Sequence, residues 1–234
     1  MSSRLSRFVV LLSLSFPFMS VQAGTINLTD WAFNINGDIS EAYLGDPMPG
    51  SGSLDASTGL GTLSFDFLAP GSHSFVGFFD MDIDAHLNTY FNEFGAAHGT
   101  AGAGQSWQID EPGYVFGSIY DNTLAGSLSN SNNLPSGTPE DVSFALGWDF
   151  VLAPGETAQL FLTLSHVLDT TGFYLEQVDH ETGPDFSEST SIYFWSSLEI
   201  SGGSVAVPEP ASLGLLALGL MLVASRRSGT RQAR

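Results

Sequence analysis

Three aspartates alternate with apolar residues in the segment 79–84, whose sequence is FDMDID. Side chains two positions apart on a β-strand share a face and lie about 6.6–7 Å apart, so this alternation predicts one acidic and one apolar face. Oxygen ligands without a thiolate suit a hard cation such as Ca²⁺. The candidate calcium ligands are Asp80, Asp82, Asp84 and Glu93. The other interpretation, which the sequence leaves open, is an acidic strand face in full solvent.

The residue patterns of common enzyme active sites are missing. The five histidines form no His-x-His or His-Glu-x-x-His pair, no Gly-x-Ser-x-Gly elbow occurs, and the chain has no cysteine. Asp110 and Glu111 could serve glycoside hydrolysis, but adjacent strand residues point to opposite faces. We therefore expect no enzymatic activity. Aromatic rings could instead stack on sugars if they were exposed, although most lie in apolar strands; the candidates are Trp107, Tyr114, Tyr120, Trp148 and Trp195.

The charged residues are distributed very unevenly along the chain. All six basic residues are arginines in the two terminal segments, so residues 24–207 contain no Lys or Arg, whereas every acidic residue except Glu209 lies there. Nucleic-acid binding needs cations opposite phosphates, and this composition excludes it. Carboxylates in such a body must be dispersed, protonated, hydrogen-bonded to neutral groups or held by a cation.

The body between the terminal segments has the pattern of an all-β protein. Apolar and polar residues alternate in several runs, and turn residues separate these runs. A Pro-Gly turn at 153–156 joins two of the runs and predicts a β-hairpin over 142–166. Further strands are expected at 25–35, 62–67, 74–84, 114–120, 172–178 and 191–200, with a short helix at 86–94. We therefore expect residues 24–203 to form a single domain, an antiparallel, jelly-roll-like β-sandwich.

Both ends of the chain have the features of targeting segments. Arg4 and Arg7 precede an apolar run at 8–18, and the small residues of Val21-Gln22-Ala23 predict cleavage of a helical signal peptide (1–23) between Ala23 and Gly24. At the other end, Pro208-Glu209-Pro210 precedes an apolar run at 211–224 and then Arg226-Arg227. A helix of this length spans roughly 21 Å, which is short for a bilayer core of about 30 Å.

The C-terminal arrangement resembles the PEP-CTERM sorting signal of Gram-negative bacteria. The residues that carry the resemblance are Pro208, Glu209, Pro210, Arg226 and Arg227. The resemblance implies a linker and motif at 204–210, a transmembrane sorting helix at 211–225 and a basic cytoplasmic tail at 226–234. It also implies that signal peptidase and exosortase act during export, that the chain passes transiently through the inner membrane, and that it reaches the outer surface or extracellular matrix.

The body is also similar to a β-rich domain family of unknown function that accompanies PEP-CTERM signals. The resemblance rests on short runs at 77–80, 88, 92–93, 110–114, 141–143 and 172–175. It transfers no catalytic residue. Together, these features favour a non-enzymatic surface or matrix protein, sorted by exosortase and linked to exopolysaccharide or biofilm. The alternatives are a carbohydrate-binding module, stabilised by calcium in one version, and, less favoured, a glycan-active hydrolase.

Overall fold

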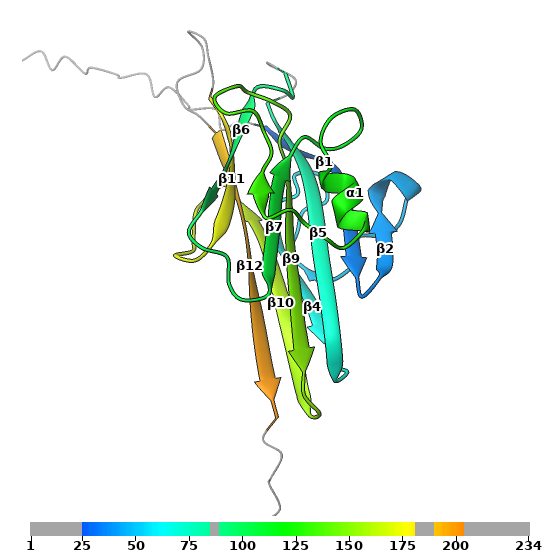
Figure 1. Ribbon diagram of the computed structural model, residues 1–234. Helices are drawn as coiled ribbons and strands as arrows, with labels where there is room; N and C mark the ends of the chain where they lie inside the picture. Colours follow the sequence, from blue (N-terminus) through cyan, green and yellow to red (C-terminus); the bar gives the residue numbers. More distant parts are fainter. Residues whose placement is uncertain (1–24, 85–88, 181–189, 204–234) are drawn as a thin grey trace, which may run out of the picture.

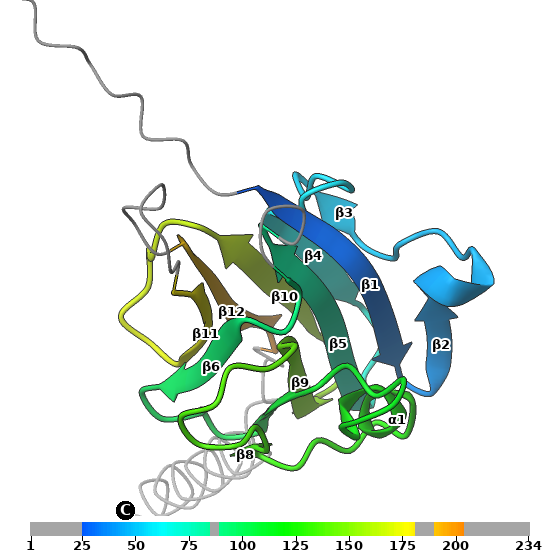
Figure 2. The same cartoon turned by 90° about the horizontal axis from the view of Figure 1, so that it is seen from above.

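The computed structural model describes residues 25–84, 89–180 and 190–203, which form two stacked β-sheets (Figures 1 and 2). The predicted signal peptide with its Ala23-Gly24 cleavage site lies outside the described residues. So do the motif at 208–210, the predicted helix at 211–225 and the arginines that follow it. Within the described ranges, no helix is long and apolar enough to cross a membrane.

Each sheet has six strands, and every pair of neighbours is antiparallel except β7 with β8. Sheet A contains, in spatial order, β2 (Asp38–Glu41), β1 (Ile26–Ile35), β5 (Gly71–Ile83), β9 (Ser143–Leu152), β7 (Gln105–Asp110) and β8 (Ser131–Asn132). Sheet B contains β3 (Ser51–Gly52), β4 (Gly61–Phe67), β10 (Glu156–Ser165), β12 (Thr190–Gly202), β11 (Tyr174–Asp179) and β6 (Glu93–His98). Two short helices, η1 (Ala42–Leu44) and α1 (Ile119–Leu124), complete the fold. The prediction of an all-β sandwich is confirmed.

The core lies between the sheets and is dominated by phenylalanine. Phe33 and Phe79 of sheet A are fully buried, and their ring centroids lie 5.6 Å apart. From sheet B, Phe65 lies 5.6 Å from Phe33 and Phe194 lies 5.4 Å from Phe79. These separations are typical of favourable edge-to-face and tilted ring pairs. The period-2 alternation of the sequence therefore does select the residues that face the core.

The prediction of a β-hairpin at 142–166 is wrong. β9 pairs with β5 and β7 in sheet A, whereas β10 pairs with β4 and β12 in sheet B. The turn at 153–155 therefore carries the chain from one sheet to the other, and residues 68–70 do the same between β4 and β5 at the same end (Figure 1). Both arrangements bury alternating apolar residues, so alternation alone does not distinguish a hairpin from a crossing between sheets.

The expected strand at 114–120 is also absent. Residues 111–118 form a loop, and α1 follows it on the outer face of sheet A (Figure 2). Ile119 of α1 is fully buried against a second, smaller apolar cluster that includes Ala32, Phe78 and Ala145. The apolar residues of this segment thus cover the sheet instead of joining it. The expected helix at 86–94 is not seen in its described part, because Glu93 begins β6.

Replacement of a central core ring tests the packing of the two sheets. We expect Phe79→Ala to lower the free energy of unfolding by about 3–5 kcal/mol, because it leaves a cavity between Phe33 and Phe194. Val151→Ala, at a side chain that is 67% exposed, should cost less than about 1 kcal/mol. Urea unfolding measures both values, and equal losses for the two variants would contradict the described core.

Candidate functional site

Four residues in register form a row across the outer face of sheet A. Asp30 of β1 pairs with Asp80 of β5, Asp80 pairs with Ser143 of β9, and Ser143 pairs with Asp110 of β7. Directly paired residues project from the same face with Cβ atoms about 4.5–5.5 Å apart. Since the neighbouring Phe79 faces the core, the row faces outward, beneath the loop at 111–118. Three carboxyl groups thus share one line on a sheet without a nearby lysine or arginine.

Asp110 anchors the covering loop through neutral donors. Its Oδ2 accepts hydrogen bonds from the Ser118 backbone N–H at 3.0 Å and from the Asn133 and Gln108 side-chain amides at 3.0 and 2.9 Å. Its Oδ1 accepts the backbone N–H of Glu111 at 3.0 Å. These contacts close the ends of the 111–118 loop on one carboxylate, so Asp110 has a structural role beside the site.

Asp30 holds the middle of the same loop. The Tyr114 hydroxyl donates to Asp30 Oδ2, and the Trp31 backbone N–H donates to Asp30 Oδ1 at 2.8 Å. Burial, together with the bond to Asp30, raises the pKa of the Tyr114 hydroxyl, which therefore stays protonated as the donor. The loop is fixed to the sheet from both sides of Asp80.

Asp80 occupies the centre of the row and is 2% exposed. Burial, followed by the negative charge of Asp141, raises its pKa well above the usual value, and the 2.8 Å hydrogen bond from Ser143 Oγ opposes this only in part. The site therefore favours the protonated form of Asp80 or contact of its carboxylate with a cation.

A cavity of about 510 Å³ opens beside Asp80. Six of its lining residues, called the acidic wall below, carry a carboxyl group or a hydroxyl: Asp80, Asp82, Glu111, Glu140, Asp141 and Thr29. The remaining lining residues are Tyr90, Phe91, Pro112, Tyr114, Val115 and Phe116. The volume lies within the range of small-molecule binding sites, about 300–1,000 Å³.

The acidic wall of the cavity is short of hydrogen-bond donors. Asp82 accepts a 2.8 Å hydrogen bond from Thr29 Oγ1, but the buried Asp141 Oδ1 has no hydrogen-bond partner among the described residues. Burial and then the charge of Asp82 raise the pKa of Asp141 to about 7. Burial also raises the pKa of Glu111. An unpartnered buried carboxylate oxygen is costly, so this wall is suited to a donor or a cation supplied by a ligand.

The aromatic lining residues of the cavity are exposed. Phe91, Tyr114 and Phe116 are 52%, 59% and 67% exposed. The Phe91 and Tyr90 rings meet edge to face at 4.9 Å. Aromatic side chains of this size are usually buried, and an exposed group beside a cavity is typical of a binding surface.

The four predicted calcium ligands do not come together. Asp80 and Asp82 line the outer cavity, whereas Glu93 is fully buried between the sheets, where it accepts hydrogen bonds from the Ile83 N–H at 2.8 Å and from the Gln177 side chain. β5 ends at Ile83, and Asp84 has φ of 51°, which turns it out of the strand alternation and toward the Thr25 N–H. In the described parts of the chain, no three Asp, Glu or His side chains are grouped as a metal site.

Among the five aromatic residues considered for sugar stacking, Tyr114 is the one that lines the cavity. Trp107 is half-buried against Phe173 at 5.7 Å, and Trp148 donates to Ser196 Oγ at 2.9 Å. Tyr120 donates to Glu41 at 2.7 Å, and Trp195 is half-buried on β12. Tyr90, Phe91 and Phe116 were not among the candidates, because an apolar residue in a loop gives no sequence signal of exposure.

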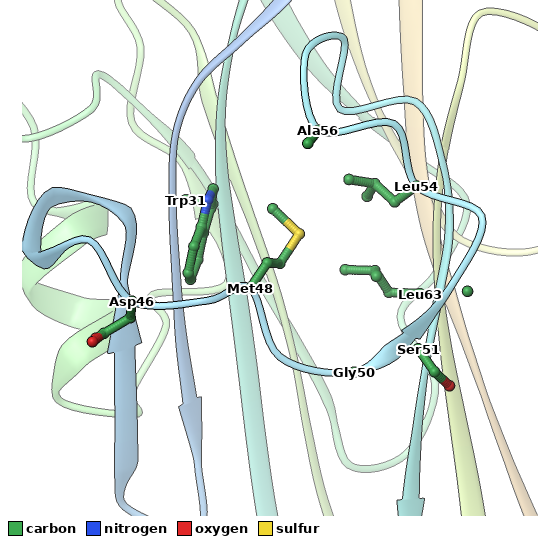
Figure 3. Close-up of a pocket in the computed structure, with 9 residues that line it drawn as sticks. Trp31, Asp46, Met48, Gly50, Ser51, Leu54, Ala56 and Leu63 are labelled. Atoms are coloured by element: carbon green, nitrogen blue, oxygen red, sulfur yellow. The ribbon is translucent and has the colours of Figure 1, made fainter.

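A second cavity, of about 400 Å³, lies at the edge between the sheets (Figure 3). Trp31, Met48, Leu54 and Leu63 point into it, while Asp46 points away. Trp31 and Leu63 belong to the core, and the cavity has no buried charge. This opening extends the core packing to the surface and has fewer groups that could orient a ligand.

Comparison with known proteins identifies the C-terminal segment. Residues 206–228 match the PEP-CTERM protein-sorting motif. The chain carries a PEP-CTERM sorting signal. The match includes Pro208-Glu209-Pro210 and Arg226-Arg227, and it marks an exported protein that exosortase sorts to the cell surface. No curated protein sequence and no solved structure matches the chain.

The resemblance of the exoprotein's body to a β-rich family stays a prediction, but several of its runs meet in space. Asp80 ends one run, Glu111–Tyr114 belong to a second, and Asp141 begins a third; all line the cavity. Asp30 and Asp141 were not predicted as site residues. The place of Asp30 depends on strand pairing, and Asp141 reaches the cavity from the segment before β9; the local sequence encodes neither contact.

The raised pKa of Asp141 predicts how the stability of the exoprotein depends on pH. A carboxyl group whose pKa is about 7 when folded binds its proton more tightly folded than unfolded, so its contribution to stability falls as pH rises from about 4 to about 7. Asp141→Asn removes this loss. Because Asp141 is partly exposed, we expect a gain of about 1 kcal/mol, or about 2–4 °C in melting temperature, at pH 8 and little at pH 4.

Asp38→Asn is the matched control, since it removes one negative charge from an exposed position on β2. It should leave the difference between the melting temperatures at pH 8 and pH 4 unchanged. An Asp141→Asn variant that behaves like Asp38→Asn would contradict the burial of the Asp141 carboxyl group.

Proposed function

We propose that the processed exoprotein is a non-enzymatic surface or matrix protein of a Gram-negative bacterium, and that it associates with extracellular polysaccharide. The sorting signal supports delivery to the cell surface. The observation that carries the rest is the cavity on sheet A, which carboxyl groups and exposed aromatic rings line together. This proposal joins the matrix protein with the carbohydrate-binding module that the sequence left as an alternative.

The two walls of the cavity match the two kinds of surface on a sugar ring. Aromatic faces such as Tyr114 and Phe116 can pack on the apolar C–H face of a pyranose. The carboxylates on the other side can accept hydrogen bonds from hydroxyl groups. A cavity with a few convergent polar groups and an apolar wall has the usual composition of a small-molecule site.

The pKa shifts favour binding over hydrolysis. Glycoside hydrolysis needs one carboxyl group with a raised pKa beside another that stays ionised. The cavity carboxyl groups with shifted pKa values, namely Asp80, Asp82, Glu111 and Asp141, all shift upward, and burial is the leading cause in each. Because the pKa values of these four groups shift in the same direction, the shifts do not separate a protonated acid from an ionised nucleophile.

Binding to the polysaccharide of the native host tests the proposal. We expect the processed protein to co-sediment with that polysaccharide. The double variant Phe91→Ala with Phe116→Ala should lower the affinity about 10-fold, because packing of an aromatic ring is typically worth about 1 kcal/mol. Tyr43→Ala is the control, because Tyr43 is 81% exposed on η1 and lies outside the cavity.

Absence of binding, or equal losses for the cavity variant and Tyr43→Ala, would contradict polysaccharide binding at this site. Release of new reducing ends by the wild-type protein, lost in Asp80→Asn, would contradict the non-enzymatic role and select a hydrolase.

The mass of the protein at the cell surface tests the sorting part of the proposal separately. We expect a chain that begins at Gly24 and ends near Pro208–Pro210, with or without an added glycan, because both targeting segments would be removed during export. Intact-mass spectrometry of surface and medium fractions measures this. A chain that keeps residues 211–234 in the membrane fraction would contradict exosortase processing.

A further inference from the structure

We propose that the sugar unit bound in the sheet A cavity carries a free, protonated amine, so that the polysaccharide is cationic. This inference rests on the proposed polysaccharide binding and narrows it to one chemical class. Uniformly neutral or acidic polymers would then be poor ligands.

The first argument is the charge of the cavity. Beside burial, the charges of Asp141 and Asp82 raise the pKa of Asp80, and the charge of Asp82 raises that of Asp141; Glu111 and Glu140 line the same cavity. The body has no lysine or arginine that could approach them. A hydroxyl group leaves this negative charge uncompensated, and an acidic sugar adds to it, whereas an ammonium group compensates it.

The second argument is the unused acceptor. Asp141 Oδ1 is buried at the cavity and has no partner in the part of the chain that the structure describes. A carboxylate oxygen only accepts hydrogen bonds, and an ammonium group supplies three donors with a positive charge. A protonated amine that enters here supplies the donor that the protein lacks.

The third argument comes from the aromatic wall. Phe91, Tyr114 and Phe116 present exposed rings in the same cavity as the carboxyl groups. A ring face attracts a cation within about 6 Å of its centroid, and it also packs on the C–H face of a sugar. Bare divalent cations would leave this wall unused, and the described carboxyl groups are not gathered around one ion position.

Oligosaccharides that differ only at nitrogen test the inference. The probes are a β-1,4-linked glucosamine hexamer, its fully N-acetylated form and cellohexaose, titrated by calorimetry into the processed protein at pH 6 in low salt. We expect the glucosamine hexamer to bind about 10-fold more tightly than the other two, and to lose most of this advantage in high salt.

Two kinds of variant separate charge from stacking. Asp82→Asn with Asp141→Asn should remove the preference for the amine, so that the glucosamine hexamer binds no more tightly than its N-acetylated form. Asp38→Asn with Asp66→Asn, which removes the same charge from exposed positions outside the cavity, should preserve the preference. Melting curves of all variants confirm that each is folded before titration.

The outcomes distinguish this inference from the proposed function. Equal affinity for the three hexamers would overturn the cationic ligand while polysaccharide binding stands. Binding of an oligolysine peptide and of no sugar would overturn both and indicate a basic protein partner. An amine preference that survives in the cavity variant would place the charge contact elsewhere and overturn the assignment to this site.

Discussion

Buried carboxyl groups on sheet A have only neutral partners, and this constraint shapes the outer face of the molecule. The body contains no lysine or arginine, so Asp30 is held by a tyrosine hydroxyl and a backbone N–H, and Asp110 by amides and a serine. Asp80, between them, has one serine and a raised pKa. Like charges directly opposite on adjacent strands are destabilising, and each carboxyl group in the row therefore needs its own donor or its own proton.

The same contacts build the cavity. The donors to Asp30 and Asp110 belong largely to the 111–118 loop and its ends, so satisfying these two carboxyl groups also fixes the loop above the sheet. With the loop held at both places, its own Val115 and Phe116 have no core to enter and remain exposed beside Asp80. The acidic wall and the apolar wall are therefore two results of one arrangement of hydrogen bonds.

The sequence predicts the faces of the strands better than their partners. Alternation correctly places Phe33, Phe65 and Phe79 in the core, because one face of each strand must leave water. It fails at the supposed hairpin of 142–166, because the same pattern fits two strands of one sheet or one strand in each of two facing sheets. The site shows the same limit: Asp80 and Asp82 are visible as an acidic face, but Asp30 joins Asp80 only through pairing across the sheet, and Asp141 reaches the cavity from the segment before β9.

The last described strand ends at the end of the sandwich opposite the cavity. β12 ends at Gly202 opposite Glu156, next to the turn that joins the two sheets at 153–155. Gly71 starts β5 at that same end, opposite Leu152, and Asp80 lies nine residues further along β5, roughly 30 Å away at about 3.3 Å per residue. The chain therefore leaves the described body toward its sorting signal at the end remote from the acidic row.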